Sequence, residues 1–314
     1  MATYTSASAI GEREDLSDVI YRIDPDETPL VSNAQKETTK GIFHEFQVQE
    51  LAAAVDTNYV NEGADYSYVN PNPTVRHGNY HQISVQAASV SNTLDVVDKA
   101  GRDKETAMVK VLKGIEQRRD INKALYKNEA RSGSDPRKAA KLITWITNGD
   151  KPGDMAFATG DGSDAADLTG TAAALTLAKI DAAMLAAYSD GGSPNMLLMS
   201  PTNKQNFSGL SSGSVATNQL HMTAPKEAAI IGSVSLYLSD FGELSVTVDR
   251  QCPNSEMYLI DTDYVCIGSL PGRMFSVSDV ASTGDATKFA IVSEWTLIVK
   301  APKAHAAVIG LNGS

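Results

Sequence analysis

Hydrophobic and polar positions alternate in two stretches within the first hundred residues. The first stretch has its apolar positions at Ile42, Phe43, Phe46 and Val48, and the second, which begins at Gln82, has Ile83, Val85 and Ala87 on one face. Asn, Gly and Pro interrupt the chain densely between 61 and 78. Two strands joined by a long, turn-rich segment predict a projecting hairpin. With so few apolar positions on each strand, this hairpin buries little by itself.

A helical pattern follows from about 100 to 128. Its inward positions repeat at 100° per residue and are Met108, Val111, Leu112, Ile115, Asn122 and Tyr126. About 28 residues make a helix about 42 Å long. Gly133 and Pro136 stand just beyond its end. The pattern therefore predicts one long, single helix.

The remaining chain alternates between helix and strand signals. The stretch "LTLAKIDAAMLAAYSDGG" predicts an amphipathic helix, and "MLLMS" at 196–200 predicts a buried strand. Strand patterns dominate from 230 onward. The order of these elements indicates an α+β protein with a strand-rich frame, one long helix and a mixed lobe.

The stretch "RIDPDETPLVSN" at 22–33 predicts an extended arm. Pro25 and Pro29 favour extended backbone at themselves and at the residues before them. An extended arm leaves many peptide groups unpaired unless it lies against something else. We therefore expect the arm either to be disordered or to lie across a neighbouring molecule.

Charge is unevenly distributed along the chain, and this distribution bears on whether the protein binds nucleic acid. The net charge is −11; residues 1–30 carry seven acids and two Arg, whereas residues 99–141 carry thirteen Lys or Arg and six acids. The basic run is typical of a solvated helix face. Only Tyr126 supplies an aromatic ring within it. Because nucleic-acid readers usually interleave aromatic residues with basic ones, we do not expect a sequence-specific DNA binder.

Neither a membrane span nor a secretory signal is readable. No window approaches the roughly 18 to 20 uninterrupted apolar residues of a span. The N-terminus lacks a basic start and an apolar core. We expect a protein made and kept in a cytoplasm, with Cys252 and Cys266 as partly buried thiols in a reducing compartment.

One motif is typical of an enzyme. "GLSSG" at 209–213 matches G-x-S-x-G, and Asp249 and His305 follow Ser211 in the chain order of α/β-hydrolases. A nucleophile elbow needs a strand before the Ser and a helix after it. Here the preceding "PTNKQNFS" predicts helix and the following "SVATNQ" predicts loop. A Ser hydrolase therefore stays an alternative without its structural context.

Two further patterns suggest metal sites but lack essential ligands. His77 and His81 are four residues apart, which suits zinc on a helix, yet Gly78 and Asn79 between them oppose helix. In a strand the rings would lie about 13 Å apart, so we expect surface histidines. The acidic stretch at 160–167 lacks the residue order of a calcium loop, which predicts a solvated loop. We expect no catalytic residue, metal or cofactor.

Taken together, the arm, the hairpin and the long helix give the chain a family resemblance. It resembles major capsid proteins of tailed phages with the Hong Kong 97-type fold. The residues that carry the resemblance span nearly the whole chain in order: "GEREDLSDVIYRIDPDETPLVSNAQK", "FQVQELAAA", "NEGAD", "RHGNYHQI", "VSNTLDVVDKAGRDKE", "LYLSDFGELSVTVDR", "STGDATKFAIVSEWTLIV" and "AHAAVIGL".

The resemblance implies a role for each segment. It implies an N-terminal arm at 1–41, an extended loop at 42–92, a peripheral domain with the spine helix at 93–139, an axial domain at 140–265 and a return to the peripheral domain at 266–314. It also implies a shell of pentamers and hexamers that encloses double-stranded DNA in a virion, assembled in a bacterial host's cytoplasm. Portal, scaffold and decoration proteins are the implied partners. Because the arm starts almost at Met1, we expect a separate scaffold or none.

Contacts between copies would use the arm and the loop. We expect Pro25 and Pro29 to lie in contacts, and Glu62 and Asp65 to meet Arg76, Arg118 or Arg119 of adjacent subunits. A solvated role for each of these charges is the alternative. Lys110, Lys113 and Lys123 on the long helix are candidates for facing DNA non-specifically. A third reading, an encapsulin-like cargo compartment, shares the same fold.

Overall fold

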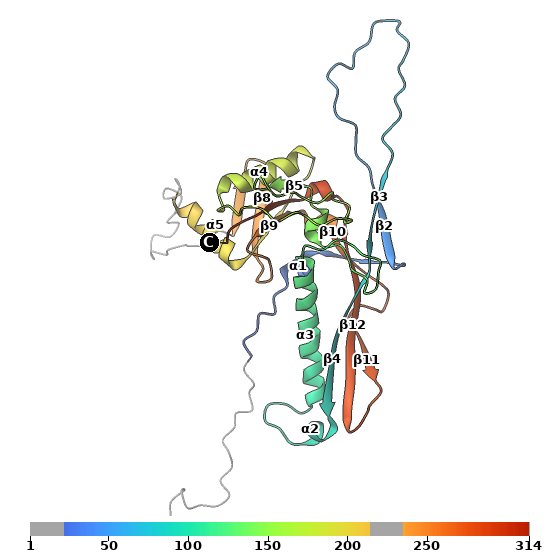
Figure 1. The fold of residues 1–314 in the computed structure, drawn as a ribbon, viewed down its shortest axis with the longest axis vertical. Helices are drawn as coiled ribbons and strands as arrows, with labels where there is room; N and C mark the ends of the chain where they lie inside the picture. Colours follow the sequence, from blue (N-terminus) through green and yellow to red (C-terminus); the bar gives the residue numbers. More distant parts are fainter. Residues whose placement is uncertain (1–21, 214–234, 314) are drawn as a thin grey trace, which may run out of the picture.

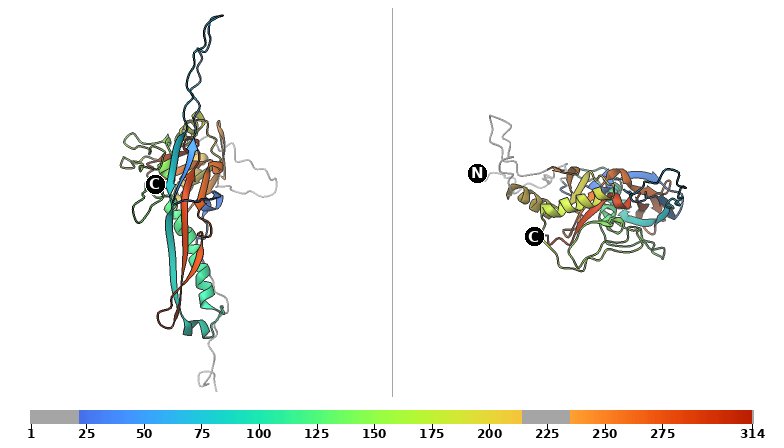
Figure 2. Two further views of the ribbon diagram at one scale, coloured as in Figure 1. Left: turned by 90° about the vertical axis from the view of Figure 1, so that its right-hand side faces the viewer. Right: turned by 90° about the horizontal axis from the view of Figure 1, so that it is seen from above.

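The computed structural model describes residues 22–213 and 235–313. Its two main sheets lie at either side of a central core, and a thin hairpin projects from their junction (Figure 1). Turned by 90°, the molecule is narrow, with α3 lying alongside the long strands β4 and β12 (Figure 2). Residues 1–21 of the predicted arm lie outside the described residues.

A five-stranded sheet forms the elongated half of the molecule. Its central strand is antiparallel to three neighbours, and the first strand pairs in parallel at the edge. The strands are β1 (Gln35–Thr38), β10 (Val265–Ser269), β12 (Ala286–Val299), β11 (Ser276–Val280) and β4 (Gln82–Ser91). The short helix α2 (Asn92–Val96) follows β4 at the far tip (Figure 1).

The long helix α3 runs along this sheet and is shorter than predicted. It spans Glu105–Leu125 instead of about 100–128. Gly101 adopts a left-handed φ of 76° in the preceding turn, and this conformation is incompatible with a helix. The buried residues include Ile121 and Asn122, but Val111 is 64% exposed, so its predicted inward position is wrong. At 100° per residue, Val111 lies at the edge of the apolar stripe, next to the solvent-exposed face of the helix.

A six-stranded sheet forms the second half. Its strands, in spatial order, are β5 (Asn148–Asp150), β13 (Ala306–Ile309), β9 (Glu256–Ile260), β6 (Met196–Met199), β8 (Gly242–Val248) and β7 (Leu236–Ser239). Helices α4 (Leu177–Ser189) and α5 (Pro201–Gly213) pack on one face through a cluster that includes Met184 and Phe207. The predicted helix and the buried strand at 196–200 are therefore present.

The last strand differs from the prediction for 266–314. β13 pairs with β9 and β5, so the chain returns to the six-stranded sheet after β12. The short helical turn Pro302–Ala304 makes this passage. Strand patterns in the sequence show that a strand exists, but they do not specify its partner, which is decided by burial between non-local segments.

One hydrophobic cluster joins the two sheets. It contains α1 (Pro29–Asn33) through Leu30 and Val31, the last turns of α3, and inward residues from both sheets, with Trp145 and Trp295 fully buried. The two halves thus share one core. Pro29 begins α1 instead of continuing the extended arm, because a proline at the first helical position loses no helical hydrogen bond.

The hairpin is built from strands that differ from those predicted. β2 (Phe43–Val48) pairs with β3 (Val75–Tyr80), whereas the stretch from Gln82 is β4 of the five-stranded sheet. Gly78 makes the pairing possible, because a Cβ at this position would lie 2.6 Å from the Phe43 ring. The return strand was missed since "VRHGNY" is polar and contains this glycine.

Among residues 22–213 and 235–313, no helix is both long and apolar enough to cross a membrane.

Candidate intersubunit surfaces

The segment at 49–74 is the part of the predicted 42–92 loop that lies beyond β2 and β3; it is called the extended loop from here on, and it projects far beyond the rest of the molecule (Figure 1). It contains no strand or helix. Its apolar side chains are largely in solvent: Leu51 is 95% and Tyr68 92% exposed, and Val55, Tyr59, Val60, Tyr66 and Val69 are exposed too. It carries four acids and no Lys or Arg. An exposed apolar segment of this size is typical of an interaction surface.

Two buried residues, Asn79 in β3 and His81 after it, connect the base of the hairpin to the core; this base is called the hairpin root. Asn79 makes four hydrogen bonds: it donates to the carbonyl oxygens of Leu297 (2.7 Å) and Ala140 (3.2 Å), and it accepts from the backbone N–H groups of Ala140 (2.8 Å) and Tyr80 (2.9 Å). His81, the single residue between β3 and β4, contacts the Thr39 hydroxyl through Nε2 at 2.9 Å. The root is therefore rigidly connected to the shared core.

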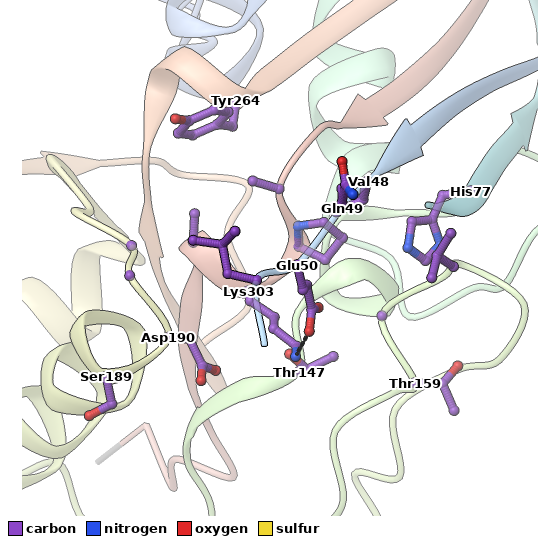
Figure 3. Close-up of a pocket in the computed structure, with 18 of the residues that line it drawn as sticks. Val48, Gln49, Glu50, His77, Thr147, Thr159, Ser189, Asp190, Tyr264 and Lys303 are labelled. Atoms are coloured by element: carbon purple, nitrogen blue, oxygen red, sulfur yellow. Dashed lines mark hydrogen bonds and ion pairs between the residues drawn. The ribbon is translucent and has the colours of Figure 1, made fainter. Parts of the chain in front are cut away.

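A groove of about 790 Å³ separates the hairpin root from the six-stranded sheet. Its walls come from the first residues of the extended loop, the end of α4 and the turn that precedes β13 (Figure 3). The Lys303 Nζ and Glu50 Oε2 atoms form an ion pair across it at 2.8 Å. Both side chains are about half exposed, so the pair contributes little to stability.

The predicted loop and hairpin contacts lie on accessible surface. Glu62 and Asp65 are exposed on the extended loop. Arg76 lies on β3, where its guanidinium is 3.6 Å from the carboxylate of Glu45 on the facing strand. Its side chain is 67% exposed, so this ion pair leaves much of the guanidinium available.

The arm residues and their candidate partners are close together in one subunit. Pro25 is half-buried before α1, and Pro29 is its first residue. Arg118 on α3 donates to the Ser32 hydroxyl at 2.8 Å, which connects α1 to α3. Arg119 is half-buried on α3. Arg118 therefore already has a partner within its own subunit.

The three lysines proposed to face DNA differ in their surroundings. Lys110 lies 3.4 Å from the Asp279 carboxylate on β11 and over the Phe289 ring, so it faces the sheet. Lys113 forms an ion pair with Glu116 at 2.6 Å. Lys123 is exposed. Of the three, Lys123 offers the least encumbered ammonium group.

The hydrolase alternative lacks the local structure that a catalytic Ser needs. Ser211 lies within the backbone of α5, without the strand-to-helix turn of a nucleophile elbow. Asp249 accepts hydrogen bonds from Asn122, Tyr126 and the Gln251 backbone, and His305 accepts one from the Asp261 backbone. The geometry gives this alternative no support.

The expectation of surface histidines is wrong for His81. Its side chain is fully buried and His77 is half-buried, because both belong to the fastened hairpin root. Desolvation by burial is the largest cause that lowers the pKa of both imidazoles. Burial also lowers the pKa of His305 to about 4.

The other candidate chemistry has structural explanations. Cys252 and Cys266 are free and buried. Asp161 and Asp164 in the acidic loop accept hydrogen bonds from Thr159 and Ser163. Among the described residues, no group of three or more His, Cys, Asp or Glu could hold a metal ion.

Two buried polar residues were not identified from the sequence. Asn79 appeared only as a residue that opposes helix, and Lys141 had no assigned role. Lys141 is 1% exposed; its ammonium bonds to the Gln82 side chain and lies 4.8 Å from the centroid of the Trp295 ring. Burial lowers the pKa of this lysine to about 8. No periodic signal marks either residue, because their partners are distant in the sequence.

Acid should weaken the fold through His305. Its folded-state pKa of about 4 lies below the ordinary value of 6.5, so the unfolded chain takes up the proton first. Its contribution to stability is present above pH 6.5 and is lost as the pH falls toward 4, by about 3 kcal/mol in total. Protonation is disfavoured because the ring is fully buried; its Nδ1 also accepts the Asp261 N–H at 3.1 Å.

Urea unfolding at pH 7 and pH 4.5 measures this effect. The His305→Asn variant can still accept the Asp261 N–H but does not titrate, so its unfolding free energy should change less between the two pH values than that of the parent. Equal changes in parent and variant would show that His305 is not responsible.

The chain is similar in sequence to known proteins. A sequence model of the SU10 major capsid protein family matches residues 2–312. The chain belongs to this family. A major capsid protein of Escherichia phage Phieco32 is 29% identical over 129 residues, which is 41% of this chain and 37% of that protein. The match thus spans little more than a third of that relative.

Solved structures share the fold of this capsid-family chain. The capsid subunit of cyanophage A-1(L) has a TM-score of 0.69 at 13% identity, covering 98% of each chain. The capsid of a native GTA particle has a TM-score of 0.61 at 14% identity, covering 98% of this chain and 97% of that one. These likenesses confirm the Hong Kong 97-type capsid fold.

An encapsulin has the same fold. The SrpI encapsulin of Synechococcus elongatus PCC 7942 has a TM-score of 0.58 at 12% identity, covering 100% of this chain and 98% of that one. The fold alone therefore does not separate a cargo compartment from a phage capsid. The match to the SU10 family over almost the whole chain favours the capsid.

Proposed function

We propose that copies of this chain assemble into the icosahedral head of a tailed phage, as pentamers and hexamers around double-stranded DNA. The extended loop is the observation that carries the proposal. It holds seven exposed apolar side chains that its own subunit leaves uncovered. Such a segment becomes stable when a neighbouring copy buries it.

Each part of the fold has a place in this proposal. The five-stranded sheet with α3 is the peripheral domain, and the six-stranded sheet with α4 and α5 is the axial domain at capsomer centres. The N-terminal arm and the extended loop reach neighbouring subunits. The product is a virion component assembled in the bacterial cytoplasm, with portal, scaffold and decoration proteins as further partners.

In this proposal, the outer face of the five-stranded sheet binds the extended loop of another copy. Side chains alternate along β4, so Ile83 and Val85 point away from α3, and they are 46% and 52% exposed. Lys288 of β12 is on the same face. Arg273 contacts Glu294 beside them and is half exposed. This apolar, partly basic face matches an apolar loop that carries only acids.

Electron microscopy and sedimentation of the purified chain expressed alone test the proposal. Shells, sheets or capsomer rings would support it. A monomer that also fails to assemble when coexpressed with a matching scaffold protein would overturn it.

Charge reversal tests the loop contacts residue by residue. Glu62→Lys with Asp65→Lys should reduce shell yield or shell stability, because two attractive pairs with an adjacent subunit become repulsive. Arg76→Glu in the same chain should partly restore assembly if Arg76 is a partner. Sedimentation of shells in increasing salt measures both effects.

Asp154→Lys with Asp240→Lys is the matched control, since it makes the same total charge change at two exposed acids near the six-stranded sheet. If Glu62→Lys with Asp65→Lys assembles like this control, Glu62 and Asp65 are solvated charges.

Packaged DNA would meet the helix α3 non-specifically. Lys123 is the best candidate, because Lys110 and Lys113 are already paired. Affinity of empty shells for DNA should fall with salt, and Lys123→Gln should reduce that dependence. Binding that is independent of salt would contradict an electrostatic role.

A further inference from the structure

The side chain of Asn122 lies where three parts of the fold meet. Asn122 is fully buried near the end of α3. Its Oδ1 accepts the backbone N–H of Val31 in the arm helix α1 at 3.2 Å. Its Nδ2 donates to Asp249 Oδ2 at 2.7 Å, just after β8 of the six-stranded sheet, and to Gln251 Oε1 at 3.2 Å. One amide thus contacts the arm and the six-stranded sheet together.

Asp249 dictates which way this amide points. Both carboxylate oxygens of Asp249 act as hydrogen-bond acceptors, so the NH₂ group of Asn122 is the group that faces them. The oxygen is then left for the Val31 N–H. If the amide turned over, NH₂ would face the Val31 N–H and oxygen would face the carboxylate, and two buried hydrogen bonds would become repulsive contacts.

Asp249 is itself fixed by uncharged donors. Besides the Asn122 amide, it accepts the Tyr126 hydroxyl at 2.8 Å and the Gln251 N–H at 2.9 Å. The carboxylate is fully buried. Tyr126 is on α3, whereas Gln251 follows β8, so the position of Asp249 depends on how the six-stranded sheet meets α3.

The arm helix is short, and its seat depends on few contacts. α1 has five residues and buries Leu30 and Val31. Its polar links to α3 are the Val31–Asn122 hydrogen bond and the Arg118–Ser32 hydrogen bond. A helix this short is not stable alone. Loss of one buried hydrogen bond is therefore expected to weaken the packing of α1 against α3 strongly.

We propose that Asn122 couples the packing of α1 against α3 to the position of the six-stranded sheet. When Asp249 is in place, the amide is oriented to hold α1. When the sheet shifts relative to α3, the amide loses its orientation and the arm is released. The coupling belongs to the single subunit and does not depend on the proposed shell.

Hydrogen exchange on the full-length chain tests the coupling. Asn122→Asp places a second carboxylate against Asp249 and should speed exchange of the Val31 and Ser32 amides by about tenfold or more. The swap Asn122→Asp with Asp249→Asn should restore protection, because the new acid accepts from both Val31 and the new amide. Amides of β2 and β3 report on the remainder of the fold and should be unchanged.

Ile121→Val is the matched control. It removes one buried methylene group from the neighbouring residue and lowers stability without touching the amide. If it speeds exchange in α1 as much as Asn122→Asp, or if the swap does not restore protection, the proposal is wrong.

A reciprocal measurement keeps the test independent of any one variant. Coupling works in both directions, so loosening the arm must loosen Asp249. Leu30→Ala should therefore speed exchange of the Gln251 amide, which donates to Asp249. Unchanged exchange there, with α1 released, would also overturn the proposal.

Discussion

A variant in which an Asn-Gly turn replaces residues 49–74 should keep its fold and fail to form shells. Val48 and Val75 are directly paired, so a two-residue turn can close β2 and β3. The replacement removes seven exposed apolar side chains and four acids from the subunit surface. Because these side chains are largely exposed in the subunit, their loss should reduce association between subunits and leave folding intact.

Sedimentation and electron microscopy measure assembly, and urea unfolding measures the fold. The replacement also removes the Glu50–Lys303 ion pair, which Glu50→Gln removes alone. That control should assemble normally, since a half-exposed pair contributes at most about 1 kcal/mol. Shells formed by the shortened variant at the parent's yield would show that the extended loop is not an assembly contact.

Asn79→Leu should be the most destabilising single substitution at the hairpin root. Leucine is similar in size but cannot replace the four hydrogen bonds to Tyr80, Ala140 and Leu297. The substitution leaves four backbone groups without this partner in a buried site. We expect a loss of about 3–6 kcal/mol in the free energy of unfolding.

Urea unfolding with hydrogen exchange checks this expectation. Exchange in β2 and β3 should rise first, because the root is their main connection to the core. Gln47→Leu on the neighbouring strand is the control: Gln47 is exposed, so its change should stay within about 0.5 kcal/mol. Equal unfolding free energies for both variants would refute the role of Asn79 as the fastening residue.

Local patterns predicted the elements that depend on neighbours in the sequence. The long helix, the helix before Gly191 and the strand at 196–199 follow from periodicity and breakers, and the structure contains all three. The resemblance to capsid proteins predicted the family, which the match over residues 2–312 confirms. The locations of Glu62 and Asp65 on an exposed loop also followed from its Asn, Gly and Pro content.

The errors have a common physical origin. β3 was missed and β4 was assigned to the hairpin, because polar "VRHGNY" forms a strand only through Phe43 against Gly78. His81 was expected on the surface, yet the junction of hairpin and sheet buries it. Val111 was placed inward, yet no other described segment of the subunit buries it, and it is 64% exposed. In each case a partner distant in the sequence decided the outcome.

Proline, glycine and hydrophobic periodicity act over a few residues, so the amino-acid sequence sufficed to predict the projecting loop and the long helix. Strand pairing, the burial of polar groups and the packing of α1 depend instead on contacts between distant segments of the folded chain. Asn79, Asn122 and Asp249 acquire their roles from partners up to 218 residues away. Buried hydrogen bonds of this kind depend on where the folded chain brings donors and acceptors together, and no local pattern records that position.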